Sequence, residues 1–288
     1  MKTQLQIILV AIAVLLAGCS GTNQQSEEFE RKQLFDFDWR FHLGDVQEAS
    51  AASFNDDDWR LLDLPHDWSI EGDFDALHPA GNDGGYLPTG IGWYRKSFKA
   101  PSDWRDKKIS VYFEGVYENS EVFINGASLG VRPYGYASFL YDLTPHLKVG
   151  EENVISVRVD NANQKNCRWY SGSGIYRHVW LIATDNVHIK HWGVGITTPQ
   201  VNRDEAIVEI TTLVKNDADA PQNITLSTKI KGEESGAETL IEIEPGTEEQ
   251  VVQRIEVKNP SLWSPDSPTL YQAEVEIIHD NRVIDRTT

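Results

Sequence analysis

The feature that most constrains this chain is an alternation of apolar and polar residues with a period of two. In residues 155–159 (ISVRV), isoleucine and valine alternate with serine and arginine, which is the pattern of a strand with one buried face. The same period recurs in four later runs, at residues 208–214, 224–230, 251–257 and 271–277. No segment has the spacing of an amphipathic helix of about three turns. The sequence therefore predicts an all-β chain.

The distribution of tryptophan divides the chain into two parts. Seven of the nine tryptophans come before residue 184, and the later part is richer in valine, isoleucine, threonine and glutamate. The first part, residues 34–184, contains the hairpin signal Asn125-Gly126 and long loops at residues 78–92 and 132–136. These features favour a wide β-sandwich of the jelly-roll kind. In the second part, residues 185–288, short strands separated by turn-forming pairs predict an immunoglobulin-like β-sandwich.

The N-terminus predicts export. Lys2 precedes eleven apolar residues at 7–17, fewer than the roughly 20 that a membrane-spanning helix needs. The ending LAGC at residues 16–19 resembles the bacterial lipoprotein signal, in which cleavage before the cysteine leaves Cys19 modified by lipid. We therefore expect a signal peptide at residues 1–18, a flexible tether at residues 19–33, and anchoring to a bacterial membrane in the periplasm or at the cell surface. A soluble exported protein is the alternative.

Charge and cysteine content narrow the possible partners. Of the 26 basic residues, removal of residues 1–18 takes away only Lys2, which leaves 25 basic against 44 acidic residues and a net charge of −19. Such acidity argues against nucleic acid as a partner, and against binding of an anionic membrane by anything other than the lipid. Cys19 and Cys167 are the two cysteines, so lipidation of Cys19 would leave no intrachain disulfide.

Residues 168–181, RWYSGSGIYRHVWL, combine a loop and a strand. Arg168, Trp169 and Tyr170 offer one charge and two aromatic faces, a combination that binds sugars and other polar rings. Two glycines then favour a tight loop, and the last seven residues are typical of a buried strand. The functional interpretation is a ligand contact presented by a β-scaffold. The structural alternative is that the two aromatic side chains cover the end of a sandwich.

Five spaced motifs occur in the first part of the chain. They are LPHDW at residues 64–68, PTGIGWYR at 88–95, FEGV at 113–116, VFING at 122–126 and SGIYR at 173–177. As a set they resemble the N-terminal sugar-binding domain of the family 2 glycoside hydrolases, the group of the β-galactosidases, β-glucuronidases and β-mannosidases. A sixth motif, SLWSPDSP at residues 261–268, looks like the end of that family's second, immunoglobulin-like domain. The resemblance implies a galactose-binding-like jelly roll followed by an immunoglobulin-like sandwich.

The resemblance implies that the parent protein is a β-galactosidase-like glycoside hydrolase acting on terminal β-linked sugars. Family members continue into a (β/α)₈ barrel that holds both catalytic carboxylates, whereas this chain stops at Thr288. The family's acid/base glutamate follows an asparagine, and no Asn-Glu pair occurs in the 288 residues. We therefore expect a chain with no catalytic residue and no cofactor, inactive by itself, whose second sandwich lacks its last strand. Its expected partners are the carbohydrate substrate and the missing barrel.

The resemblance also points to two loops as sugar contacts. In β-galactosidase-like members an acidic residue of the loop before SGIYR contacts the sugar and a monovalent ion, and this position falls at Asn166. An amide cannot neutralise a cation as a carboxylate does, so the sequence leaves ion binding open and assigns no metal ligand. In the other loop, Leu87 occupies the place of a sugar-binding asparagine, and a neighbouring polar residue would have to replace it. The substrate-binding candidates are Asn166, Arg168, Trp169, Asn82 and Asp83.

Three other polar groups are weaker candidates for chemistry. The triple aspartate at residues 56–58 could share a proton, but a solvated turn before a strand is the better interpretation. His66 and Asp67 could act as a base and its orienting partner, although their motif favours a structural loop. His188 and His191 are three residues apart and are expected on opposite faces of a strand, which excludes them as joint metal ligands.

Two further functions stay open beside that of an enzyme part. One is a lipid-anchored carbohydrate-binding module without hydrolase activity. The other is purely structural, with both sandwiches orienting a barrel or a partner subunit and contacting no sugar.

Overall fold

The structure, a computed structural model, describes residues 31–288. The predicted signal peptide, the lipidated Cys19 and most of the tether lie outside these residues. The first strand, β1 (Lys32–Leu34), begins within the predicted tether, so the folded part starts before residue 34. It starts there because β1 pairs with β10 (Val179–Thr184), which places Lys32 opposite Ile182. No helix within residues 31–288 has the length and apolar character needed to cross a bilayer.

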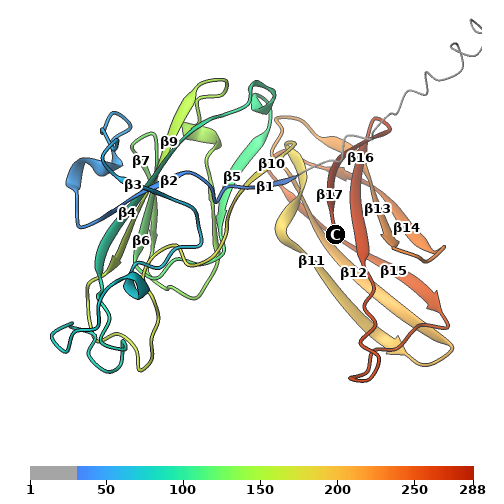
Figure 1. Cartoon of the computed structure of the whole chain (residues 1–288). Helices are drawn as coiled ribbons and strands as arrows, with labels where there is room; N and C mark the ends of the chain where they lie inside the picture. Colours follow the sequence, from blue (N-terminus) through green and yellow to red (C-terminus); the bar gives the residue numbers. More distant parts are fainter. Residues whose placement is uncertain (1–30) are drawn as a thin grey trace, which may run out of the picture. The chain divides into compact units, whose positions relative to one another are not determined.

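Two antiparallel sheets form the first sandwich, which is drawn in blue to yellow-green in Figure 1. The larger sheet has the strand order β3-β2-β4-β9-β6-β7, and the smaller has the order β1-β10-β5-β8. The remaining strands of these sheets are β2 (Trp39–Leu43), β3 (Arg60–Leu62), β4 (Gly90–Lys99), β5 (Lys108–Phe113), β6 (Ser120–Ile124), β7 (Ala127–Arg132), β8 (Phe139–Asp142) and β9 (Glu152–Asn161). Short 3₁₀ helices lie between them at η1 (Gln47–Ser50), η2 (Ser69–Glu71), η3 (Ser102–Trp104) and η4 (Thr144–His146). The predicted wide sandwich is confirmed.

The core between these two sheets is aromatic as well as aliphatic. Trp39, Tyr94 and Phe113 are fully buried, and the alternating residues of β9 contribute Val157 and Val159. Burial of such large apolar side chains supplies the main free energy of folding, at about 25 cal/mol per Å² removed from water. The tryptophan-rich composition of the first part of the chain therefore reflects its core.

A buried cation explains part of the aspartate triplet. Arg95 of β4 is only 1% exposed, and its Nε donates to Asp56 Oδ2 at 2.8 Å. Its Nη1 donates to Ser156 Oγ at 3.0 Å. Asp56 is therefore the counter-ion of a buried arginine, whereas Asp57 and Asp58 are exposed as expected for a solvated turn. The interpretation of the triplet as a solvated turn was thus wrong for Asp56.

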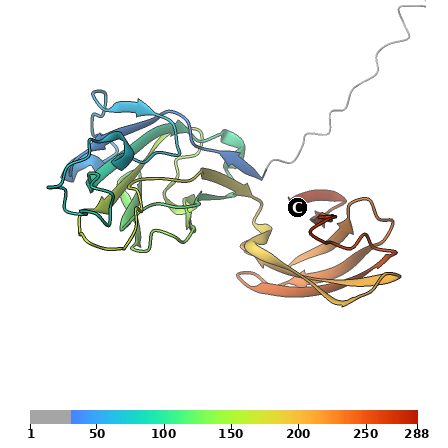
Figure 2. The same cartoon turned by 60° about the horizontal axis from the view of Figure 1, so that its bottom comes forward.

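Two antiparallel sheets, of three and four strands, form the second sandwich, which runs from yellow to red in Figure 2. Their strand orders are β11-β12-β15 and β14-β13-β16-β17. The strands are β11 (Val187–Val201), β12 (Glu205–Asn216), β13 (Gln222–Ile230), β14 (Gly236–Ile243), β15 (Glu248–Lys258), β16 (Ala273–His279) and β17 (Arg282–Thr287). Two sheets with seven strands match the predicted immunoglobulin-like sandwich, but β11, with 15 residues, and β12, with 12, are longer than the predicted short strands. Within residues 31–288, β17 is an edge strand that pairs only with β16. That the second sandwich lacks a last strand beside β17 stays a prediction.

The period of two corresponds closely to burial in this sandwich. Ile210, Val214 and Leu226 are fully buried, as the alternation predicts. The last run begins later than its pattern suggests, because Tyr271 precedes β16 and is 41% exposed. Tertiary packing, not periodicity alone, therefore sets where that strand starts.

A buried carboxylate joins the start of the described chain to its last strand. Asp285 of β17 is fully buried, and its Oδ2 accepts from the backbone N–H of Ile189 at 2.7 Å and from Arg31 Nη1 at 2.9 Å. Burial raises the pKa of Asp285 to about 6, although Arg31 and the backbone donors oppose that rise. Both residues belong to the same compact unit, residues 31–288.

A bulge in β11 corrects the expected placement of two histidines. The pairing of β11 with β12 shifts between Ile189 and Val194, and Trp192 has a positive φ of 56°. The strict alternation of faces is lost there, and His188 and His191 line the same cleft. The expectation that they lie on opposite faces was therefore wrong, because it assumed a regular strand.

Candidate functional site

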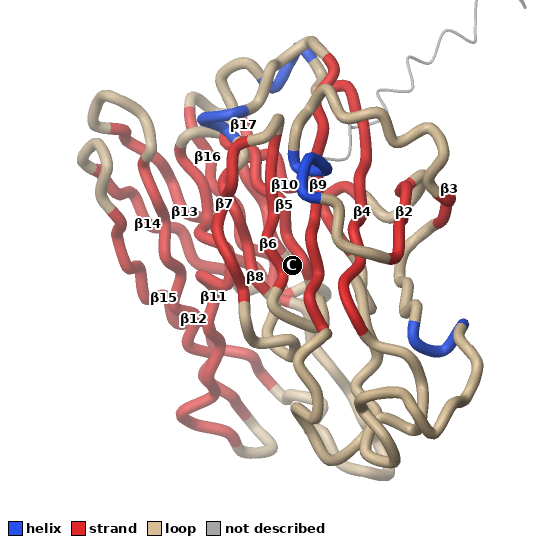
Figure 3. The backbone as a smooth tube through the Cα atoms, turned by 90° about the vertical axis from the view of Figure 1, so that its left-hand side faces the viewer, coloured by secondary structure: helices blue, strands red, loops and turns tan. Residues whose placement is uncertain are grey.

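Four loops emerge from one end of the jelly roll because of how its strands pair. Gly90 at the start of β4 pairs with Asn161 at the end of β9, and Phe113 at the end of β5 pairs with Val179 at the start of β10. The loops at residues 63–89, 114–119, 133–138 and 162–178 therefore lie at the same end. Figure 3 shows long tan loops gathered beyond the lower ends of β4 and β9. Both predicted sugar-contacting loops belong to this group.

Asp67 fixes the longest of these loops to the loop around residue 172. Its Oδ1 accepts from the backbone N–H of Ser69 at 2.9 Å and of Ser173 at 2.8 Å, and its Oδ2 accepts from the Tyr170 hydroxyl. Gly172 has a φ of +73°, and a Cβ there would lie 2.6 Å from Asp67 Oδ2. Only glycine permits both this backbone angle and this close approach. Asp67 is thus a positioning residue.

The geometry does not make His66 a general base. Its Nδ1 lies 2.7 Å from the Tyr94 hydroxyl, and its Nε2 lies 3.2 Å from Arg60 Nη2. Burial lowers the pKa of His66, whereas Glu71 opposes that change. No hydrogen bond joins the His66 and Asp67 side chains in the part of the chain that the structure describes. The pair is structural, as the motif suggested.

Asn166 lies in a polar network with a carboxylate that the sequence did not indicate. Its Nδ2 donates to Glu118 Oε1 at 2.7 Å and to Asn161 Oδ1 at 2.8 Å. The hydroxyl of Tyr117 donates to Asn166 Oδ1 at 3.3 Å. Burial raises the pKa of Glu118, and the hydrogen bond from Asn166 opposes that rise. The amide therefore occupies the predicted loop position beside an acidic group from another loop.

The other two polar candidates meet the same loop through Lys165. Its Nζ donates to Asn82 Oδ1 at 3.1 Å and lies 3.0 Å from Asp83 Oδ2. Leu87 is buried, so its position offers no polar group at the surface. The structure thus brings Asn82 and Asp83 into contact with Lys165, the residue before Asn166, and these contacts join the two loops.

The aromatic part of the site has a fixed orientation. Trp169 is 59% exposed, and its indole N–H donates to the Tyr136 hydroxyl at 2.9 Å. The ring of Tyr136 packs against that of Tyr117, with 5.2 Å between centroids. Arg168 is exposed and forms no hydrogen bond or ion pair with residues 31–288. An exposed, hydrogen-bonded tryptophan beside a free guanidinium can contact the apolar face and the hydroxyls of a sugar.

Three residues of this cluster were missed by sequence reasoning. Glu118 and Tyr136 come from loops far from Asn166 in sequence, and only the strand pairing brings them near. Lys165 adjoins Asn166 but carried no motif. The aromatic content of the loop at 133–138 was a usable signal for Tyr136, whereas nothing local marks Glu118.

The chemistry available here is hydrogen bonding, stacking and charge. Within residues 31–288, no group of three or more histidine, cysteine or acidic side chains is arranged to hold a metal ion. Cys167, the free cysteine in this range, donates its thiol hydrogen to the Trp169 carbonyl. The loop cluster can bind and orient a polar ligand.

Comparison with known families places this site in context. The sequence profile of the sugar binding domain of glycosyl hydrolases family 2 matches residues 35–185, and a second profile of glycosyl hydrolases family 2 matches residues 187–288. The chain therefore belongs to family 2 of the glycosyl hydrolases, as its motifs predicted.

Individual relatives agree with this assignment. The β-galactosidase BoGH2A of Bacteroides ovatus is 48% identical over 277 residues, which cover 95% of this chain and 32% of that protein. A putative β-glucuronidase of Formosa agariphila is 39% identical, with 96% of this chain and 26% of that protein covered. The structure of a family 2 member from Bacteroides cellulosilyticus matches with a TM-score of 0.86 at 38% identity, covering 89% of this chain and 34% of that one. The chain thus spans about a third of the length of the relatives that it matches.

Proposed function

We propose that this chain is the N-terminal, non-catalytic part of an exported, β-galactosidase-like family 2 glycoside hydrolase that cleaves terminal β-glycosidic bonds. Its jelly-roll loops frame the substrate, and both sandwiches pack on a (β/α)₈ barrel that carries the catalytic carboxylates. The observation that supports this most is the union of the two predicted loops, in which Lys165 binds Asn82 and Asp83 while the neighbouring Asn166 binds Glu118.

Each residue of the loop cluster has a role in this proposal. The exposed face of Trp169 packs on the apolar face of the sugar ring, and Tyr136 holds that face in place. Arg168 donates hydrogen bonds to sugar hydroxyl groups, and Asn166 Oδ1 accepts one, because both N–H groups of Asn166 are already donated to Glu118 and Asn161. Holding the sugar against a separate acid and nucleophile lowers the barrier by orientation, which contributes to catalysis without a chemical step.

Trp169→Ala tests sugar binding by the loops. Titration of the 288-residue chain with galactose, glucuronate and their β-linked disaccharides, followed by tryptophan fluorescence, is expected to show a response that Trp169→Ala abolishes. Trp263→Ala is a matched control, because Trp263 is 60% exposed against 59% for Trp169 but lies in the second sandwich. Equal losses in both variants, or no response to any of these sugars, would favour a purely structural role.

Activity measurements test the division between framing and chemistry. The isolated chain is expected to hydrolyse no aryl β-galactoside, because a retaining glycosidase needs two carboxyl groups about 5–5.5 Å apart across the bond. Measurable hydrolysis that disappears in Asp57→Asn or Asp67→Asn would contradict this expectation. Genomic DNA downstream of the Thr288 codon provides a second test. An in-frame barrel with an Asn-Glu pair supports the proposal, whereas a stop codon followed by unrelated sequence contradicts it.

A lipid-anchored carbohydrate-binding module without hydrolase activity is the second candidate function. The exposed, fixed ring of Trp169 favours it, because this surface is complete in the chain alone. Sugar binding by the isolated chain together with a stop codon after Thr288 would support this candidate over the first.

Export with lipid anchoring at Cys19 is part of both candidates. Expression in a bacterium supplied with radiolabelled palmitate is expected to label the chain and to place it in the membrane fraction. Cys19→Ser should abolish both, whereas Cys167→Ser should change neither. Membrane association that survives Cys19→Ser would contradict the lipid anchor.

A further inference from the structure

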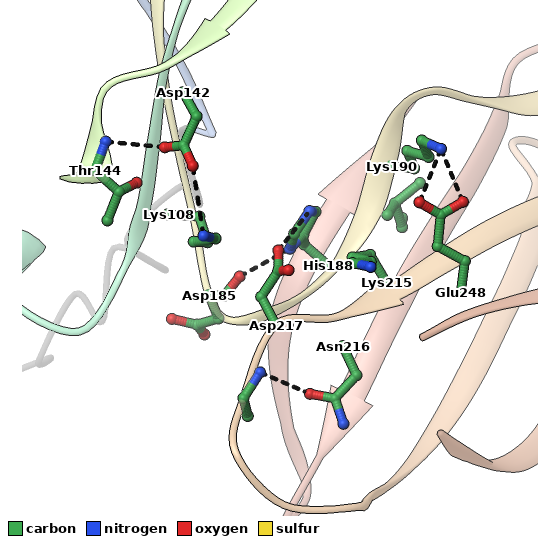
Figure 4. A network of polar contacts seen from close by, with 12 residues as sticks. Lys108, Asp142, Thr144, Asp185, His188, Lys190, Lys215, Asn216, Asp217 and Glu248 are labelled. Carbon is green, nitrogen blue, oxygen red and sulfur yellow. Dashed lines mark hydrogen bonds and ion pairs between the residues drawn. The ribbon is translucent and has the colours of Figure 1, made fainter. Parts of the chain in front are cut away.

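A cleft of about 670 Å³ is lined by residues of both sandwiches and shares the loop at residues 133–138 with the Trp169 loop cluster, but not Trp169 itself. The jelly roll contributes side chains from β5, β7 and β8 and from the loop at residues 133–138, and the second sandwich contributes side chains from β11. Figure 4 shows part of its lining, with Lys108 and Asp142 on one side and His188, Lys190 and Asp217 on the other. All of these residues lie within one compact unit, residues 31–288.

Cations outnumber carboxylates in the lining of this cleft, whereas the whole chain is acidic. Four cations line it against two carboxylates, although the chain has a net charge of −18. The cations are Arg31, Lys108, Arg132 and Lys190, and the carboxylates are Asp142 and Asp217. A concave surface lined by one sign of charge attracts ligands of the opposite sign.

These cations differ in how far they are already neutralised. Arg31 and Lys190 are occupied, since Arg31 binds the buried Asp285 and Lys190 donates twice to Glu248, at 2.7 and 2.8 Å. Lys108 is only 3.5 Å from Asp142. The exposed Arg132 has no carboxylate within ion-pair distance among residues 31–288, and its guanidinium lies 5.9 Å from the centroid of Phe139. Arg132 is therefore the cation available to a ligand, whereas Lys108 would have to exchange its contact with Asp142 for one with the ligand.

Two exposed aromatic rings and an unpaired imidazole nitrogen complete the lining. Tyr134 and Trp192 also line the cleft, and each is 65% exposed. The Nε2 atom of His191 is buried without a hydrogen-bond partner among the described residues. Burial, together with Arg31 and Lys32, lowers the pKa of His191 to about 4, so its ring is neutral at pH 7. A buried polar atom without a partner is costly unless a ligand or water supplies the hydrogen bond.

We propose that this cleft binds an acidic oligosaccharide, with Arg132 and Lys108 on its carboxylates and Trp192 and Tyr134 against its sugar rings. Cations alone would suit any anion, and the exposed aromatic faces favour rings over a peptide or a free phosphate. This inference does not depend on Trp169, which does not line the cleft.

The test is isothermal titration calorimetry of the 288-residue chain with three probes at low and physiological salt. Tetragalacturonate is expected to bind saturably, and more weakly at the higher salt concentration. The neutral tetragalactose and the charge-matched tetraglutamate are expected to bind at least about tenfold more weakly, because each lacks one part of the recognised chemistry. Equal binding of tetraglutamate and tetragalacturonate would overturn the proposal, and so would no binding of tetragalacturonate.

Variants locate the binding. Arg132→Gln and Trp192→Ala are each expected to weaken tetragalacturonate binding about tenfold, while Arg132→Lys and Trp192→Phe retain most of it. Arg203→Gln is the matched control, because Arg203 is an exposed cation in the turn between β11 and β12, outside the lining. It should change affinity less than about twofold. Thermal melts of all variants check that each is folded.

A variant of the loop cluster separates this proposal from the proposed function. Trp169→Ala should leave tetragalacturonate binding unchanged if the cleft holds the ligand. Loss of binding in Trp169→Ala, with none in Trp192→Ala, would overturn the cleft proposal and leave the loop cluster as the site. An equal loss of tetragalacturonate affinity in Arg132→Gln and Arg203→Gln would show that net charge alone attracts the ligand. That result would also overturn the cleft proposal.

Discussion

The two sandwiches of this chain are built from the same kind of strand but differ in how the strands are joined. In the jelly roll, the loops at residues 63–89 and 162–178 are long and are held by side chains such as Asp67 and Asn161. In the second sandwich every connection except residues 259–272 has five residues or fewer, and β16 and β17 are joined by Asp280 and Asn281, which both have positive φ angles, as in a tight hairpin. Strand pairing thus accounts for most of the second sandwich, whereas side-chain hydrogen bonds determine the shape of the candidate site.

The largest expected effects come from core truncations that test whether the two sandwiches unfold separately. Phe113→Ala should destabilise the jelly roll by about 3–5 kcal/mol, and Ile277→Ala should destabilise the second sandwich by about 2–5 kcal/mol. Both side chains are fully buried. Calorimetry is expected to resolve two transitions, the second sandwich melting first because β17 has a free edge within the described chain. A single transition that moves in both variants would contradict independent unfolding.

Asp67→Ala should have the next largest effect, confined to the jelly roll. It removes the acceptor of two backbone N–H groups and one hydroxyl, at a cost of about 2–3 kcal/mol. Asp266→Ala is the control, since Asp266 is exposed and forms no hydrogen bond within residues 31–288, and it should change stability by less than about 0.5 kcal/mol. Urea unfolding of each variant measures the difference. Equal effects would show that the loops do not depend on Asp67.

The buried Asp285 gives the second sandwich a distinct dependence on pH. Its pKa of about 6 in the folded state lies above the ordinary value of 3.8, so the protonated form is favoured by folding. This contribution to stability is complete below pH 3.8 and is lost as the pH rises through 6. Lowering the pH from 7 to 5 should therefore raise the free energy of unfolding by about 1.4 kcal/mol through this group alone. The free energy of unfolding of the second sandwich should depend less on pH in Asp285→Asn than in the unmodified chain. An unchanged dependence would mean that other groups cause it.

The smallest expected effect on stability is that of Trp169→Ala. The side chain is 59% exposed and makes one hydrogen bond, so its loss should lower the free energy of unfolding by less than about 1 kcal/mol. Tyr136→Phe, which removes the acceptor of that bond, should do the same. Chemical denaturation measures both. A cost near that of Phe113→Ala would make Trp169 a core residue and contradict the proposal that it contacts a sugar.

The sequence was sufficient for the parts of this molecule that follow a local rule. Alternation predicted the buried faces of β9, β12 and β15, and Gly172 and Gly174 have the positive φ angles that only glycine adopts readily. The strand predicted for residues 175–181 begins only at Val179, because residues 175–178 belong to the long loop. Local rules failed where distant segments meet. The contact of Asn166 with Glu118 depends on which strands pair, and the shared cleft of His188 and His191 depends on a bulge that no spacing reveals. The family motifs identified the two loops, but not the Lys165 contacts that join them.

The pairing of Gly90 with Asn161 has a consequence for how such proteins diversify. The two long loops begin and end at strand residues whose positions are set by backbone hydrogen bonds, and those bonds do not depend on loop sequence. Insertions or substitutions within either loop therefore leave the anchoring points in place. The same sandwich should therefore accept other pairs of loops at these positions. Grafting loops from a relative with another sugar preference should transfer that preference only when both loops are moved together.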